Sequence, residues 1–209
     1  KQRQEATDDV DILPKVTISD IPLKREYTEI KKSKGNRSIY EVGTNGLIYS
    51  DFLFPCSNLT NEELLFSSLY TFILTEVGLL DKSYEEIQAY QSKISGGIGA
   101  SMKLQTNTPS EDGALFLSIS SKCLAENFEE MEAMILNTVQ NVRLDEQKRL
   151  LDLLNIFVAR NEESLNQNGH YLAMNSAASS LNSLAATSFN ISGLQMLHRS
   201  KEVIAKIQL

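Results

Sequence analysis

A change of hydrophobic period around one glycine-rich segment, residues 94–101, constrains this chain more than any other feature. Before the glycines, apolar side chains recur every three or four residues from Tyr84 to Ile94, which predicts one face of a helix. After them, apolar and polar residues alternate from Ile98 to Gln105, which predicts a strand with one buried side. We expect Gly96 and Gly97 to allow a left-handed end to the helix and to form the turn into the strand.

This strand is predicted to pair with the next one along the chain. Residues 107–113 are polar and include Pro and Gly, which is typical of a turn. Residues 114–120 then alternate again, with apolar side chains on one face. The two alternating runs therefore predict an antiparallel hairpin.

Another hairpin is predicted closer to the N-terminus. Asn45 and Gly46 separate two β-rich segments, residues 37–43 and residues 47–54. An Asn-Gly dipeptide between such segments is the strongest local signal for a hairpin turn, because both positions adopt positive φ readily. Residues 27–34, just before it, are predicted to be a short extended or irregular connection.

Helices are predicted for much of the remaining chain. Thr60 and Glu63 form a capping-box pattern at the start of an apolar helix, residues 61–77. After the second hairpin, periodic apolar residues predict four more helices, within residues 124–142, from Asp145 to Leu165, within residues 171–186 and after Ser192.

The predicted order of elements is β-β-α-α-β-β followed by four helices. This order indicates an α+β fold, with the helices packed on one face of a mostly antiparallel sheet. We expect residues 1–12 to be a linker and residues 13–209 to form a single domain. The first residue is Lys1 rather than Met, which suggests a segment of a longer protein.

Composition excludes several functional classes. The net charge of −7 argues against a general nucleic-acid-binding protein, because neutralising phosphates requires clustered Lys and Arg. No apolar run is long enough to cross a bilayer, so no membrane partner is expected. Cys56 and Cys123 form no Cys-x-x-Cys pair and are expected to be thiols in a reducing compartment, the cytoplasm or an organelle matrix, although a single disulfide is left open.

Catalytic and metal-binding motifs are missing from the sequence. The glycine-rich segment follows a helix and precedes a strand, whereas a phosphate-binding loop requires the opposite order. His170 and His198 have no metal-ligating residue at helical spacing, and no His-x-x-Glu-His sequence occurs. No Gly-x-Ser-x-Gly nucleophile motif is present either. We therefore expect no cofactor in this segment.

Several short motifs, in a specific order, carry a family resemblance. They are Leu13-Pro-Lys-Val-Thr-Ile-Ser-Asp-Ile-Pro22, Thr44-Asn-Gly-Leu-Ile-Tyr49, Ser95-Gly-Gly-Ile98 and Gly169-His-Tyr171. With them, the chain resembles the third structural domain of pitrilysin/insulinase-type zinc metallopeptidases, in the branch of presequence protease and falcilysin. The resemblance extends over nearly the whole chain from Leu13 onward.

The resemblance implies a domain without catalytic activity. Such enzymes consist of two related halves that close around a chamber, and only the first half holds zinc. The helix in the repeat position of the zinc helix is residues 61–77, which has Leu65, Phe66, Leu69 and Phe72 but no histidine. We therefore expect a structural domain that forms part of the chamber wall, with zinc only in the parent's catalytic domain. The expected partners are other domains of the same parent chain and unfolded peptide substrates.

One strand is a candidate for contact with peptides. Extended peptides can add to the edge of a sheet, and Ser101, Lys103 and Gln105 are the polar residues of the strand after the glycines. Two alternatives remain: a free-standing, zinc-less scaffold or binding subunit of the same fold, and an independent hydrolase that uses His170.

Overall fold

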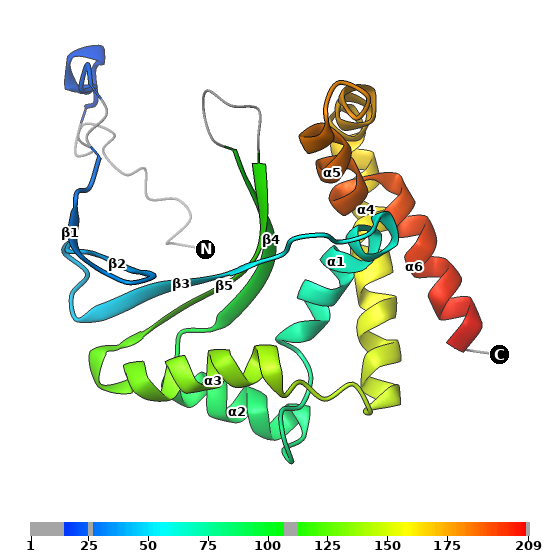
Figure 1. Ribbon diagram of the computed structural model, residues 1–209, viewed down its shortest axis with the longest axis horizontal. Helices are drawn as coiled ribbons and strands as arrows, with labels where there is room; N and C mark the ends of the chain where they lie inside the picture. The colour runs from blue at the N-terminus through cyan, green and yellow to red at the C-terminus, as the bar shows by residue number, and fades with distance from the viewer. Residues whose placement is uncertain (1–14, 25–26, 107–112, 208–209) are drawn as a thin grey trace, which may run out of the picture. The chain divides into compact units, whose positions relative to one another are not determined.

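The computed structural model describes residues 15–24, 27–106 and 113–207, and Figure 1 shows their secondary structure. Contacts within the chain divide it into two compact units, residues 1–44 and residues 45–209. The predicted linker, residues 1–12, lies outside the described residues. The predicted single domain from residue 13 onward therefore stays a prediction.

The first unit contains a hairpin. Strands β1 (Ile30–Lys34) and β2 (Arg37–Tyr40) pair antiparallel around Gly35, whose φ is +59°. Residues 27–34, predicted to be a short extended or irregular connection, contain the extended strand β1, because a turn with positive φ at Gly35 lets the two segments pair. A short 3-10 helix, η2 (Ile18–Asp20), precedes the hairpin.

The second unit is built on a three-stranded antiparallel sheet in the order β3-β5-β4. Its strands are β3 (Leu47–Pro55), β4 (Ile98–Thr106) and β5 (Gly113–Leu124). The predicted hairpin of β4 and β5 is confirmed, and residues 107–112 of its turn lie outside the described residues. Ile119, at the centre of the sheet, is opposite both Phe52 and Ala100.

The hairpin predicted around Asn45 and Gly46 is wrong. Both residues have positive φ, 51° and 82°, as their sequence predicts. The strands on either side nevertheless do not pair, since β2 pairs with β1 and β3 pairs with β5. The reason is long-range packing: pairing with β5 brings the apolar side chains of β3 into the core, which a local hairpin with β2 would not do.

Two helices connect β3 to β4, and capping boxes determine where both begin. Helix α1 (Asn61–Leu74) follows Thr60, whose backbone N–H donates to Glu63 Oε2 over 2.7 Å. Helix α2 (Tyr84–Ile94) follows Ser83, which caps it in the same way. The predicted start of α1 is confirmed, and the helix ends at Leu74 rather than at residue 77.

The glycine-rich segment joins α2 to the sheet by a different conformation from the predicted one. The helix does not end in a left-handed residue, because Ser95 is extended with φ of −142°. Only Gly97 has positive φ, +108°. The Gly96 N–H donates to the Lys122 carbonyl over 2.8 Å, and the Ser121 hydroxyl donates to the Gly97 carbonyl over 2.9 Å. Hydrogen bonds to β5 therefore hold the segment.

Four helices follow β5, as predicted. They are α3 (Phe128–Gln140), α4 (Gln147–Ala178), α5 (Ser183–Ser192) and α6 (Leu194–Ile207). The expected break between the helices ending at Leu165 and beginning at Tyr171 is only a local distortion of α4 at Asn168, with φ −114° and ψ 16°. The helix predicted over residues 171–186 is instead divided, because the Asn182 side chain caps α5.

The sheet and the helices of the second unit enclose two apolar clusters. One cluster lies between the sheet and helices α2 and α3, with Ile119, Met131 and Ile135 each 0% exposed. The other joins α1, α4 and α6 through residues such as Leu69 and Phe157. Figure 1 shows the helices gathered to one side of this three-stranded sheet. The predicted α+β fold with helices on one face of an antiparallel sheet is confirmed.

Both cysteines are free thiols, so the disulfide left open by the sequence is not formed. Cys123 lies in the cluster beneath the sheet and is 2% exposed. Burial raises the pKa of its thiol, because the thiolate would lose its hydration there. The residue therefore contributes to packing as a small apolar side chain.

Candidate functional site

The face of the sheet turned away from the helices carries most of its polar side chains. Alternation along the strands places one set of residues in the core and the other on this open face. Tyr49 and Leu53 of β3 lie there and are 63% and 41% exposed. The register adds the following residues to the same face: Asp51, Ser118, Ser120, Ser101, Lys103 and Gln105. Ser118, in the central strand, is nevertheless 0% exposed.

The three residues predicted to contact a peptide lie together on this open face. Ser101 and Gln105 are exposed, and Lys103 is partly buried. Lys103 Nζ lies 3.5 Å from Asp51 Oδ1, so its side chain spans the central strand β5. The Ser120 hydroxyl also donates to Asp51. The predicted contact of Ser101, Lys103 and Gln105 with a peptide stays a prediction.

Strand β4 has one edge that pairs with no strand among the described residues, because its only strand partner there is β5, and helices α1 and α5 contact β4. An edge strand presents unpaired N–H and C=O groups that can accept another extended chain. Side chains of such an added strand would point alternately toward the open face and toward the helix side of the sheet.

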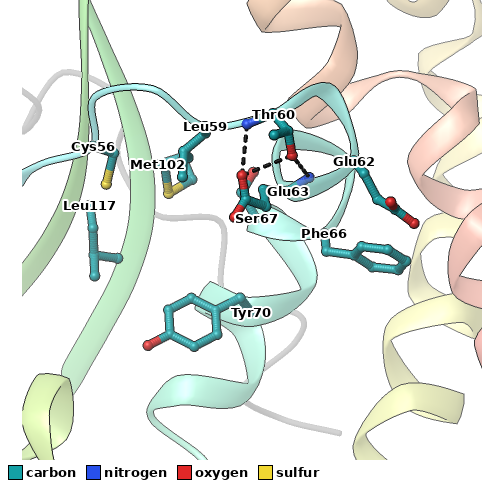
Figure 2. A pocket seen from close by; sticks show the side chains of 10 residues that line it. All are labelled: Cys56, Leu59, Thr60, Glu62, Glu63, Phe66, Ser67, Tyr70, Met102 and Leu117. Atoms are coloured by element: carbon teal, nitrogen blue, oxygen red, sulfur yellow. Dashed lines mark hydrogen bonds between the residues drawn. The ribbon is translucent and has the colours of Figure 1, made fainter.

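On the helix side, a pocket of about 590 Å³ lies between α1 and the sheet. Figure 2 shows Met102 of β4 and Leu117 of β5 on one side, with Tyr70 of α1 directed toward that side, whereas the ring of Phe66, another lining residue, points away from them. The connection from β3 to α1 supplies further lining residues, including Cys56, Leu59 and Thr60. The lining is mostly apolar in character.

Most polar side chains that line this pocket are already hydrogen-bonded. Thr60 and Glu63 bond to each other, as the dashed lines in Figure 2 show, and the Ser67 hydroxyl donates to the Leu64 carbonyl over 2.7 Å. The hydrogen bonds from Thr60 lower the pKa of Glu63, because they stabilise its charged form.

Tyr70 contributes a further polar group to the pocket lining, its phenolic hydroxyl. The residue is 39% exposed, and burial, with a smaller contribution from Cys56, raises the pKa of its phenol. The structure shows no hydrogen-bond partner for this hydroxyl within the described residues. The hydroxyl can therefore donate to a ligand.

The residues of α1 do not fit a zinc ion. Leu65 and Leu69 are buried in the cluster with α4 and α6, and Phe66 and Phe72 pack against it. No group of three or more His, Cys, Asp or Glu side chains that could hold a metal occurs in the part of the chain that the structure describes. Without imidazole or carboxylate ligands arranged together, α1 offers no means of activating a water molecule.

The two histidines do not form a catalytic group. His170 is exposed on α4, and the structure shows no hydrogen bond or ion pair from it within residues 15–24, 27–106 and 113–207. His198 lies on α6 with Nε2 3.3 Å from Oε1 of Glu202, four residues further along the helix, and its side chain is 78% exposed. The prediction that His198 has no metal-ligating residue at helical spacing is therefore wrong. Among the residues that the structure describes, no serine hydroxyl is hydrogen-bonded to His170 or His198, so the geometry gives no support to a hydrolase that uses His170.

Comparison with known proteins identifies the family. A model of the family of domains associated with peptidases of group M16, subgroup C, matches residues 1–203. The chain belongs to this family. The predicted resemblance to the presequence-protease branch of these peptidases is also confirmed, because presequence proteases match nearly the whole chain.

Among these relatives is the mitochondrial presequence protease of Drosophila melanogaster, 27% identical over 180 residues, which are 84% of this chain and 17% of that protein. That of Danio rerio is 25% identical over 206 residues, 96% of this chain and 20% of that protein. Presequence protease 1 of Arabidopsis thaliana, chloroplastic/mitochondrial, is 24% identical over 203 residues, 94% of this chain and 19% of that protein. The chain thus spans about a fifth of the length of these relatives.

In this peptidase-associated domain, the open sheet face could be anticipated from sequence and the pocket could not. Alternation alone places Ser101, Lys103 and Gln105 on one face of β4. The pocket combines residues from α1, two strands and the connection at residues 56–60, and no local pattern relates them. The one weak signal in the sequence is that α1 is apolar on nearly all sides. It therefore has more apolar side chains than its contact with the core needs, and some of them are left to line a pocket.

None of the helices in the described part has the length and apolar content of a membrane span.

Proposed function

We propose that this chain is the third, non-catalytic domain of a zinc metalloendopeptidase that degrades unstructured peptides, and that it forms part of the wall of a closed substrate chamber. The observation that carries the proposal is the match over residues 1–203 to a peptidase-associated family whose matching relatives are about five times longer. A chain that spans a fifth of such proteins, with an α1 unsuited to zinc, fits a wall domain better than a free-standing scaffold subunit.

The partners in this proposal are other domains of the parent chain and unfolded peptides. Peptides would contact the open sheet face and the edge of β4 at Ser101, Lys103 and Gln105, because an edge strand binds extended chains through its backbone regardless of their sequence. Zinc would reside in the parent's catalytic domain. The names of the relatives place them in mitochondria or chloroplasts, which supports an organelle matrix as the location.

The test uses a full-length peptidase that contains this domain. Replacing Ser101 and Lys103 together by Ala should raise KM for an unstructured peptide several-fold and leave kcat nearly unchanged, because these residues would bind substrate without touching the reacting atoms. Lys148→Ala, an exposed lysine at the start of α4, is the matched control. Unchanged peptide affinity in the double variant would count against the proposed contact.

A further inference from the structure

We infer that the pocket between α1 and the sheet binds a large apolar side chain of an extended peptide, with Lys or Arg next to that side chain. This inference rests on the proposed function, since it specifies which peptides the domain would hold. The volume of the pocket, about 590 Å³, lies within the range of pockets that hold small ligands. This volume is larger than that of a single aromatic side chain. The pocket can therefore take such a side chain together with part of the adjoining backbone.

Whether the polar lining residues are already hydrogen-bonded determines what kind of ligand group would bind in the pocket. The hydroxyls of Thr60 and Ser67 are used within α1 and its cap, and the Cys56 thiol lies 3.5 Å from the Phe54 carbonyl as a weak donor. The surface that remains available to a ligand is the apolar surface of residues such as Leu59 and Met102. Burial of apolar surface would therefore supply most of the affinity.

The charge of the lining residues determines which peptide residues are favoured next to the bound apolar side chain. Glu62 and Glu63 both line the pocket, and none of its lining residues is Lys or Arg. Glu63 is ionised at neutral pH, and the hydrogen bonds from Thr60 lower its pKa further below the ordinary Glu value. A cationic residue beside the apolar anchor is thus favoured, whereas an acidic residue there is repelled.

Strand β4 connects this pocket to the predicted peptide-contact residues. Met102 faces the pocket, and its neighbours Ser101 and Lys103 face the open side of the sheet. A peptide paired along the edge of β4 that pairs with no strand would send alternate side chains to these two sides. The Tyr70 hydroxyl, which has no partner within the described residues, can donate to a carbonyl of such a peptide.

The test measures binding of labelled peptide probes to the 209-residue chain by fluorescence anisotropy. The first probe is an unstructured Gly-Ser peptide with a central Arg-Phe-Arg sequence. The second has Ser in place of Phe, and the third has Glu in place of both Arg residues. We expect the first probe to bind at least about tenfold more tightly than either of the others, from the burial of the Phe ring and from the charge at the pocket.

Variants locate the binding at the pocket. Ser67→Phe places a ring in the pocket from α1 and should weaken binding of the Phe probe about tenfold, with little effect on the Ser probe. Cys56→Leu, at a partly exposed position, reduces the pocket by a smaller amount and serves if thermal unfolding shows that Ser67→Phe is misfolded. Glu62→Gln should reduce the preference for Arg over Glu neighbours and leave the preference for Phe over Ser.

Three outcomes would overturn the inference. They are equal affinity for the Phe and Ser probes, unchanged Phe-probe binding in folded pocket variants, and binding of N-acetylphenylalanine amide as tight as that of the Phe probe. The last would assign the pocket to small apolar molecules. Failure of the proposed function would give a different result. The Ser101 and Lys103 variants of the full-length peptidase would keep their peptide affinity, whereas this chain would still bind the Phe probe more tightly than the Ser probe.

Discussion

At the scale of single residues, adjacent glycines in the turn between α2 and β4 have different structural roles. Gly97 has φ of +108°, a region that side-chain-bearing residues rarely adopt, whereas Gly96 does not have positive φ. A Cβ at Gly96 would instead lie 2.7 Å from Cε of the flexible Lys122 side chain. The backbone conformation therefore requires glycine at position 97. At position 96 the only obstacle to a larger residue is the Lys122 side chain, which can move.

We expect Gly97→Ala to lower the free energy of unfolding by about 1 kcal/mol or more, because the variant must strain its backbone or move it. Gly99→Ala is the matched control: this glycine has no positive φ, and a Cβ there meets nothing within 4 Å. Urea unfolding followed by circular dichroism measures both. Equal stability of the two variants would show that the conformation of Gly97 is not a requirement.

Two serines with buried side chains should respond differently to replacement by alanine. Ser118 and Ser200 are both 0% exposed. The Ser200 hydroxyl donates to the Met196 carbonyl over 2.9 Å, but the Ser118 hydroxyl has no hydrogen-bond partner among the described residues. We expect Ser200→Ala to cost about 1 kcal/mol of stability and Ser118→Ala to cost nothing or to stabilise slightly. A clear loss in Ser118→Ala, measured by urea unfolding, would reveal a partner for its hydroxyl.

At the scale of elements, the end of α1 and the start of α4 are joined by a polar contact. Arg149 donates to the Glu76 carbonyl over 3.0 Å and to Glu76 Oε2 over 2.9 Å, and its guanidinium lies 4.4 Å from the centre of the Tyr84 ring. Glu146 accepts a hydrogen bond from the Gly78 N–H over 3.1 Å. These contacts hold the connection from α1 to α2 against α4.

The contact of Arg149 with Glu76 and Tyr84 depends on the planar guanidinium group, which lysine lacks. We expect Arg149→Lys to lower the free energy of unfolding by about 1–2 kcal/mol, because an ammonium group cannot make both hydrogen bonds to Glu76 and also stack on Tyr84. Arg199→Lys is the control, since Arg199 pairs with Glu202 on the exposed face of α6 and such pairs contribute little. Thermal unfolding of both variants makes the comparison, and similar small losses would contradict the expectation.

The capping box of α1 should make stability depend on pH. Hydrogen bonds from the Thr60 backbone and side chain lower the pKa of Glu63 in the folded chain. The ionised form therefore stabilises the fold above the ordinary Glu pKa, and this contribution is lost as pH falls through the lower, folded pKa. We expect Glu63→Gln to lose less stability than the unaltered chain between about pH 5 and about pH 3. Identical acid dependence in urea unfolding would argue against this role.

At the scale of the whole molecule, none of the described residues of the first unit is buried. Residues 15–24 and 27–43 are all exposed, and they include large apolar side chains such as Leu23, Tyr27 and Tyr40. The buried apolar clusters consist entirely of residues from the second unit. The two units should therefore differ in how much they contribute to stability.

We expect a chain beginning at Asn45 to retain the unfolding midpoint of the full chain within about 2 °C, because removing exposed surface takes away little burial. The opposite truncation, residues 1–44 alone, should show no cooperative unfolding, because its described residues form no core. Circular dichroism with heating measures both. A large loss of stability in the shorter chain would mean that the first unit supports the second.

The sequence alone determined the elements whose signals are local. The capping residue Thr60 marks where α1 begins, because this helix start is set within four residues of chain. Period-2 alternation likewise identifies β4 and β5, and their closeness in sequence makes them partners. The positive φ at Asn45 and Gly46 is also a local property.

Only the tertiary structure decided which strand pairs with β3 and where the pocket lies. The Asn45-Gly46 turn permits a hairpin, but burying Phe52 beside Ile119 requires β5 as the partner, and that choice depends on residues more than sixty positions away. The pocket likewise forms where α1 and the 56–60 connection meet β4 and β5. Contacts between distant segments depend on how the whole core packs, and a local sequence pattern carries no information about them.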